Sequence, residues 1–207
     1  MRFPLKAVLV TTLLMTLPTV VAGQTLGFRG GWSVPTLGGD DAGENNTRTA
    51  LSFGGFFNVP VSNVLGVQLG VGVAQKGATR EADRVELAMD YLEIPLLLMF
   101  SPPTTGNMGF NFFIGPALGF RTSCTRTSPA GVTVSVDDCD DVDISLKSVD
   151  WGAMVGAGLD ISLTGNVSLV FDGFYNLGLT KIDDGGSVDR KNRALSILAG
   201  LSFSVGG

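Results

Sequence analysis

The stretch VSLVFDGFYNLGLT, residues 167–180, decides the fold class of this chain. Its odd positions are apolar residues and one glycine, whereas its even positions mix small, polar and apolar residues. A period of two is the pattern of a β-strand, because successive side chains point to opposite faces of a sheet. The stretch therefore predicts a strand with one apolar face and one mixed face.

The same alternation recurs along the chain after residue 24. It is regular in 64–76, 151–163 and 195–204, and looser in 25–33, 49–59, 85–100 and 109–122. Together with 167–180 these segments make eight strands, each near or above the ~9–11 residues that a tilted transmembrane strand needs. The apolar register of 85–100 shifts near Tyr91 and Leu92, which predicts a β-bulge or a top half that stands clear of lipid.

The connections between these segments differ in length at the two ends. Short connections lie at 59–63, 101–108 and 164–166, and long ones near 34–48, 77–84, 123–147 and 181–193. Short periplasmic turns and long external loops are typical of bacterial outer-membrane barrels. The sequence thus predicts an all-β fold in the cell outer membrane: an eight-stranded antiparallel up-and-down transmembrane β-barrel over residues 24–207, with both termini periplasmic.

The composition favours a membrane barrel over a soluble one. Charged residues make up 16 % of the chain, hydrophobic residues 44 %, and the mean hydropathy is +0.34. Soluble domains carry about 25 % charged residues. A soluble lipocalin-like barrel is the alternative, but the less apolar face here is mainly Gly, Ser, Ala and Asn, which is too little charge for an exterior in water. We therefore expect the apolar face to contact outer-membrane lipid.

Aromatic residues gather at two levels of the predicted barrel, as interfacial girdles do. Phe57, Phe100, Phe110 and Phe203 fall near the periplasmic ends of their strands, and Trp32, Phe120 and Trp151 fall near the outer ends.

Residues 1–23 have the features of a secretory signal peptide. Arg2 and Lys6 supply the positive region, residues 7–17 the short apolar region, and Ala22 and Gly23 the small residues near the cleavage site. Cleavage would change the net charge from −5 to −7, because two of the 14 basic residues and none of the 19 acidic residues are lost. Such an acidic chain is a poor ligand for nucleic acid, and we expect no nucleic-acid partner.

Cys124 and Cys139 are the two cysteines, and both follow the export signal. An oxidising compartment makes a disulfide between them the default. Two cysteines without any histidine do not predict a zinc site. The same loop holds an acidic group: Asp137, Asp138, Asp140, Asp141 and Asp143. Clustered carboxylates can bind Ca²⁺, but the spacing is not that of an EF-hand, and a solvated acidic loop is the alternative. We expect no metal and no cofactor.

Seven charged residues fall on the inward faces of the predicted strands. They are Arg29, Lys76, Glu93, Arg121, Asp150, Asp160 and Asp172. In a narrow barrel such charges should pair, because an unpaired buried charge is costly. Eight strands leave an interior that side chains just fill, so we expect a plug. A narrow polar conduit or gate is the alternative.

The absence of histidine weighs against catalysis. Acyl-transferring, deacylating and proteolytic barrels use histidine as a base, because its pKa lies near neutral pH. A serine nucleophile would need another base, and no feature of the sequence marks Lys76 for that role. We therefore expect no enzymatic activity.

Five short motifs, taken in their order and spacing, resemble the outer-membrane β-barrel "porin family" domain, including its PorT-like members. They are GFRGG at 27–31, QKG at 75–77, YLEIPLL at 91–97, GPALG at 115–119 and YNLGL at 175–179. The resemblance implies an eight-stranded barrel related in architecture to the OmpX, OmpW and OmpA membrane domains, and it implies no single activity. The chain departs from the pattern at its end, where SVGG follows Phe203 and many such barrels end on an aromatic residue.

The function that these patterns predict is structural: a barrel that anchors extracellular loops and has an envelope-structural or surface-interaction role. Its expected partners are outer-membrane lipid, the barrel-assembly machinery during biogenesis, and an extracellular or envelope protein. One alternative is a narrow channel for small, possibly apolar, solutes. Another, suggested by the PorT-like resemblance, is an accessory of secretion or assembly machinery.

Overall fold

The computed structural model describes residues 23–40, 46–80, 84–130, 133–139, 146–183 and 189–205. The described chain is built from nine strands: β1 (Gln24–Gly38), β2 (Ala50–Pro60), β3 (Leu65–Arg80), β4 (Val85–Phe100), β5 (Met108–Ala130), β6 (Thr133–Asp138), β7 (Val149–Ser162), β8 (Val167–Gly178) and β9 (Lys191–Val205). Within these ranges no helix has the length and apolarity that a membrane crossing requires. The predicted signal peptide, residues 1–23, lies almost wholly outside them.

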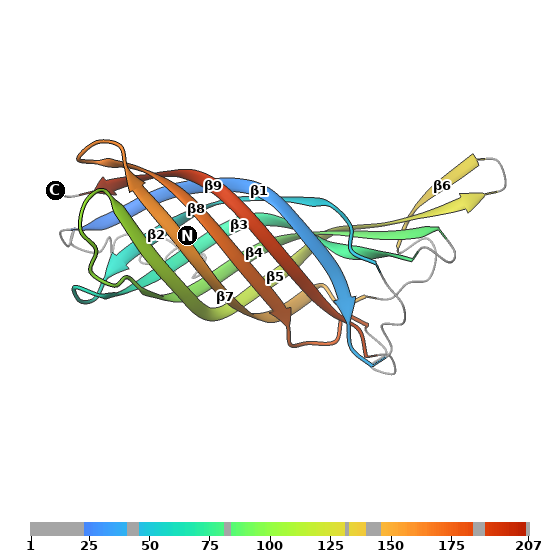
Figure 1. Ribbon diagram of the computed structural model, residues 1–207. Helices are drawn as coiled ribbons and strands as arrows, with labels where there is room; N and C mark the ends of the chain where they lie inside the picture. The colour runs from blue at the N-terminus through green and yellow to red at the C-terminus, as the bar shows by residue number, and fades with distance from the viewer. Residues whose placement is uncertain are drawn as a thin grey trace, which may run out of the picture.

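The strands form a closed antiparallel barrel. They pair in the order β4-β3-β2-β1-β9-β8-β7-β5-β6, and β4 also pairs with β5, which joins the two sides of the sheet. The barrel wall therefore has eight strands, as predicted. Figure 1 shows these strands tilted around a common axis, with the end of β9 at one end of the barrel and β6 projecting from the other.

β6 corrects the expectation of an irregular loop over 123–147. β5 continues to Ala130, well past the barrel wall, and its segment Thr125–Ala130 pairs with the whole of β6. The result is a β-hairpin that stands beyond the rim (Figure 1). Strands also extend into other stretches predicted as loops, since β1 reaches Gly38, β3 reaches Arg80 and β9 begins at Lys191.

A β-bulge lies at the predicted position beside the fourth strand, but its extra residue is in β5. The register between β4 and β5 shifts between Asp90 and Tyr91: Tyr91 pairs with Arg121 and Asp90 with Ser123, so Thr122 of β5 has no register partner on β4. On both sides of the shift Met89 and Tyr91 remain fully buried inside the barrel, and the alternation of β4 is uninterrupted. The bulge instead changes the parity of β5, where both Arg121 and Cys124 face inward although they are three residues apart.

The outside of the barrel is apolar over most of its height. Two of its most exposed large side chains are Trp32, with 67 % of its surface accessible, and Ile197, with 66 %. Aromatic side chains pack in pairs on this surface at the short-connection end: the ring centroids of Phe28 and Phe203 are 6.1 Å apart, and those of Phe100 and Phe112 are 6.4 Å apart. An apolar exterior of this kind is unfavourable in water, because burying apolar surface is worth ~25 cal/mol per Å².

We predict that the folded protein in detergent runs at a different gel mobility before and after boiling. In a closed sheet the backbone N–H and C=O groups of the wall are hydrogen-bonded to neighbouring strands, so the barrel should resist detergent and stay compact until it is heated. The measurement is electrophoresis of matched unheated and boiled samples. A single mobility for both samples would count against closure of the sheet between the first strand, β1, and the last, β9.

Candidate functional site

The barrel interior is the candidate site, because it gathers polar side chains that would otherwise be costly to bury. All seven charged residues predicted to face inward lie on inward faces, and they divide between two ion-pair clusters and one separate arginine. The clusters sit at different heights. The Arg29 cluster lies toward the short connections, and the Lys76 cluster lies toward the long ones.

The Arg29 cluster links four strands across the lumen. The Arg29 guanidinium donates to Asp172 Oδ2 at 2.6 Å and to Gln68 Oε1 at 2.7 Å. The rings of Phe56 and Phe174 flank the guanidinium carbon, with centroids 4.7 and 4.5 Å away. A planar guanidinium suits this arrangement, because it forms directed hydrogen bonds at its edge and stacks on aromatic faces.

A second carboxylate, Asp160, belongs to the same region. Its Oδ2 accepts a hydrogen bond from Asn111 Nδ2 at 2.9 Å. Gly158, two residues earlier on β7, makes room for the central ion pair, since a Cβ at that position would collide with the Asp172 carboxylate. The cluster therefore combines one cation with two carboxylates.

The Lys76 cluster has the same balance of charge. Lys76 Nζ lies 2.9 Å from Glu93 Oε1 and 3.4 Å from Asp150 Oδ2, and all three residues are buried. Asn176 donates to Glu93 at 2.6 Å, and Asn192 donates to Asp150 at 2.9 Å. Five barrel strands are thereby joined through hydrogen-bonded charges, which is the condition for tolerating charge in a low-dielectric interior.

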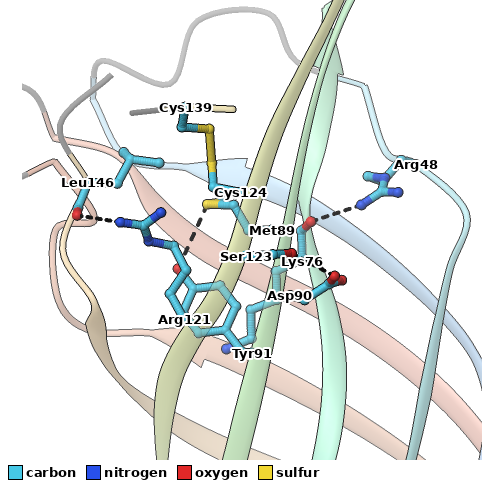
Figure 2. The surroundings of a disulfide bond; sticks show 10 residues. All are labelled: Arg48, Lys76, Met89, Asp90, Tyr91, Arg121, Ser123, Cys124, Cys139 and Leu146. Atoms are coloured by element: carbon cyan, nitrogen blue, oxygen red, sulfur yellow. Dashed lines mark hydrogen bonds between the residues drawn. A yellow bond between two sulfur atoms is a disulfide. The ribbon is translucent and has the colours of Figure 1, made fainter. Parts of the chain in front are cut away.

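Arg121, the seventh predicted residue, belongs to neither cluster. Its guanidinium donates to the main-chain carbonyl of Leu146 at 3.0 Å (Figure 2). The sequence pattern predicted a charge pair here, but the structure instead shows a link from the barrel wall to the chain that follows the hairpin.

A cavity of about 80 Å³ lies between the two clusters. Arg29, Lys76 and Glu93 line one side, and small residues of β2 and β3 such as Gly54 and Gly72 line the other. A water molecule needs roughly 10–15 Å³ of such volume, so the cavity has room for several waters beside the charged groups. The lining of this cavity combines the charged groups with apolar side chains such as Met154 and Phe174.

An apolar lid covers the Lys76 cluster on the side of the long connections. It consists of Leu37, Ala78, Met89, Tyr91, Cys124, Cys139, Leu146 and Ile182. Cys124 and Cys139 form a disulfide with a Cα–Cα distance of 5.5 Å, and both are buried in this lid (Figure 2). The disulfide therefore closes the base of the β5–β6 hairpin, inside the segment 123–147 where the sequence predicted it, and both cysteines pack within the lid.

Most of the acidic group of the third loop lies outside the described residues: the structure does not describe Asp140, Asp141 or Asp143. Asp137 pairs with Arg126 in the backbone register of the hairpin. Among the residues described, no group of His, Cys, Asp and Glu side chains is arranged to hold a metal ion.

Several contributors to the site are absent from the charged residues that the sequence singled out. Gln68, Asn176 and Asn192 are buried amides that hydrogen-bond the charges, and Phe56 and Phe174 flank Arg29. Asn192 lies in the stretch 181–193, which was predicted as a connection between strands. Alternation does place the other four residues on inward faces. It does not give the lateral offset between strands, which decides which inward groups meet.

The sequence profile of the outer membrane protein β-barrel domain family matches residues 22–184. A search of curated proteins found no match. Among solved structures, the chain is similar to Neisserial surface protein A, at 13 % identity and a TM-score of 0.55, over 89 % of this chain and 98 % of that one. It is also similar to a major outer membrane protein from Thermus thermophilus, at 15 % identity and a TM-score of 0.53, over 88 % and 99 % of the two chains. At these identities the likeness concerns the fold, and the PorT-like assignment stays a prediction.

We predict that Arg29→Ala lowers the free energy of unfolding by about 3–5 kcal/mol, because it leaves the Asp172 carboxylate buried without its cation. Urea titration of the protein folded in lipid vesicles is the measurement. The double variant Arg29→Met with Asp172→Asn removes both charges, and we expect it to lose less than the two single variants together. A loss below about 1 kcal/mol for Arg29→Ala would mean that water solvates this part of the lumen.

A second prediction concerns the disulfide. The bridge closes a loop with a sequence separation of 15 residues, for which the chain-entropy model gives roughly 3 kcal/mol. Replacing both cysteines by serine should speed proteolysis within 123–147, because the hairpin base loses its tie to the lid. The barrel strands should stay protected and heat-modifiable. Loss of the heat-modifiable form would show that the barrel itself depends on the bridge.

Proposed function

Because this chain belongs to the outer membrane protein β-barrel domain family, we propose that it is a non-enzymatic, sealed anchor that presents the β5–β6 hairpin at the cell surface. Its location is the outer membrane. The observation that carries the proposal is the combination of a filled lumen with a hairpin that projects from one end (Figure 1).

The two ends of the barrel support an orientation for this anchor. The connections 61–64, 101–107 and 163–166 are short and lie at the end where β9 finishes, whereas the hairpin rises at the other end. Bacterial outer-membrane barrels keep short turns on the periplasmic side and long loops outside. The proposal therefore places the hairpin and the lid outside the cell. The apolar outer surface of the barrel wall, here called the apolar belt, then lies against lipid.

The lumen supports a sealed barrel over an open one. Two layers of ion pairs cross it, and the lid of buried apolar residues lies above them. A passing ion would have to displace Lys76 from two carboxylates at once, which leaves buried charges unpaired. The barrel thus acts as a scaffold, and recognition falls to the hairpin.

A narrow conduit is the second candidate, and the cavity beside Arg29 and Lys76 favours it. The seven inward charges comprise three cations and four carboxylates, so a path opened through them would prefer cations. The two candidates differ in whether the lumen conducts.

We predict no steady conductance when the purified protein is inserted in planar lipid bilayers. A larger porin in the same membrane serves as the control for insertion and detection. Steady, cation-selective conductance at low voltage would contradict the sealed barrel and favour the conduit.

The presenting role is tested by affinity capture from native outer membranes followed by mass spectrometry. The matched control replaces residues 128–135, which lie beyond the Glu86–Thr127 pair, by a short glycine–serine turn and leaves the pairing of β5 with β4 intact. We expect the full chain to capture a surface or envelope protein, and we expect the variant with the shortened hairpin not to capture it. Capture of secretion components that does not depend on the hairpin would instead favour the accessory role suggested by the PorT-like motifs.

A further inference from the structure

A group of basic residues stands directly above the apolar belt on one arc of the barrel, formed by β8, β9 and β1. Lys191 and Arg193 lie at the start of β9, and Lys181 follows the end of β8. Arg193 pairs in register with Thr36 on one side and Leu177 on the other, so its side chain points outward like that of Leu195, two residues further along β9. The Arg193 side chain therefore faces the membrane side of the wall and not the lumen.

The charge of this basic group is only partly neutralised. Asp189 lies 3.6 Å from Lys181 and 3.5 Å from Lys191, so one carboxylate serves two lysines. Arg193 makes no hydrogen bond or ion pair within the described part of the chain, and its Nε is shielded from solvent without a partner. Arg190, next to Lys191, is held in a separate pair with Asp183. Among the described residues, Lys181, Lys191 and Arg193 carry three positive charges against two negative ones, those of Asp189 and of Asp40, which follows Gly39 beside Asp189.

Gly38 fixes the position of the Arg193 side chain. It is the last residue of β1 and pairs in register with Lys191. A Cβ at residue 38 would collide with the guanidinium of Arg193. The guanidinium therefore lies over the end of β1 and above the most exposed part of the belt.

The surface below this group is strongly apolar. Ile197 and Trp32 pair in register on neighbouring strands and are 66 % and 67 % exposed, and Leu195 and Tyr175 are also exposed. On the opposite arc, the outward charged residue above Leu92 is Asp90, which accepts a hydrogen bond from Ser123 at 2.8 Å. The β8–β9–β1 arc thus has basic side chains above an apolar strip, whereas β4 has Asp90 above Leu92.

We propose that this arc binds a lipid with a phosphate-bearing headgroup, its acyl chains along Leu195, Ile197 and Trp32 and its phosphate at Arg193 and Lys191. The inference rests on the proposed function, which places this rim at the outer leaflet. Charge complementarity selects the occupant, because arginine binds phosphate through paired hydrogen bonds and lysine through its point charge. The adjoining apolar strip requires a ligand with hydrocarbon chains.

The test is native mass spectrometry of the full-length protein folded in zwitterionic detergent, with purified lipid A and its dephosphorylated form as probes. We expect a retained adduct with the phosphorylated probe and little with the other. Lys191→Gln and Arg193→Gln should each weaken it by about fivefold, the fold-change that corresponds to ~1 kcal/mol per basic side chain. Gly38→Ala should weaken it without any change of charge, because it displaces the guanidinium.

Arg126→Gln, which removes one positive charge from the hairpin, is the matched control and should leave the adduct unchanged. Equal adducts for both probes, equal loss in the Arg126 variant, or full competition by inorganic phosphate would overturn the lipid site. Every variant is first checked for heat-modifiable mobility and for a hairpin that protease reaches on whole cells. If those hold while lipid selectivity fails, the lipid site is wrong and the anchor stands; if the hairpin is inaccessible from outside, the proposed function itself fails.

Discussion

In the hydrocarbon core of a membrane, a backbone N–H or C=O without a hydrogen-bond partner costs several kcal/mol, because no water is present to replace it. An open sheet has two edges of such groups, so a chain that crosses with strands must join its first edge to its last. Here that junction is the pairing of the first strand, β1, with the last, β9, which runs from Gln24–Val205 to Gly38–Lys191. The apolar belt, the narrow lumen and the separation of loops from turns all depend on this closure.

Closure with eight strands determines what the interior can hold. The space is narrow, so glycines such as Gly158 leave room for longer side chains from the facing strands. Charges are admitted only where a partner reaches across the lumen, as Asp172 reaches Arg29 and Glu93 reaches Lys76. These links are specific in geometry, and they hold together strands that are distant in sequence. Because the lumen is filled, the barrel can serve as a scaffold but has little room to bind a ligand inside. Partner binding is therefore expected at the rim and at the hairpin.

The period-two pattern was enough to predict the eight strands of the wall, the faces of the regular strands and an irregularity near Tyr91, because side-chain direction in a strand depends only on parity. It did not show that the extra residue of the bulge, Thr122, is in β5. It was also enough to place Arg29, Asp172 and Lys76 inside. It could not give their partners, because partners depend on the stagger between strands, and it left Arg121 with a carbonyl where a carboxylate was expected.

The other misses lie at the rim. β6 lies in a stretch that was predicted as a loop, although residues 133–136 (TVSV) alternate and a glycine at position 131 precedes them in the sequence. The lid joins Leu37, Leu146 and Ile182 from segments without periodicity, so no pattern in the sequence brings them to Cys124 and Cys139. Amide hydrogen–deuterium exchange of the protein in lipid tests the closed barrel most directly. The account predicts that amides of 25–37 and 192–204, where β1 meets β9, are as protected as those of β4 and β5; rapid exchange confined to β1 and β9 would mean that the sheet is open there.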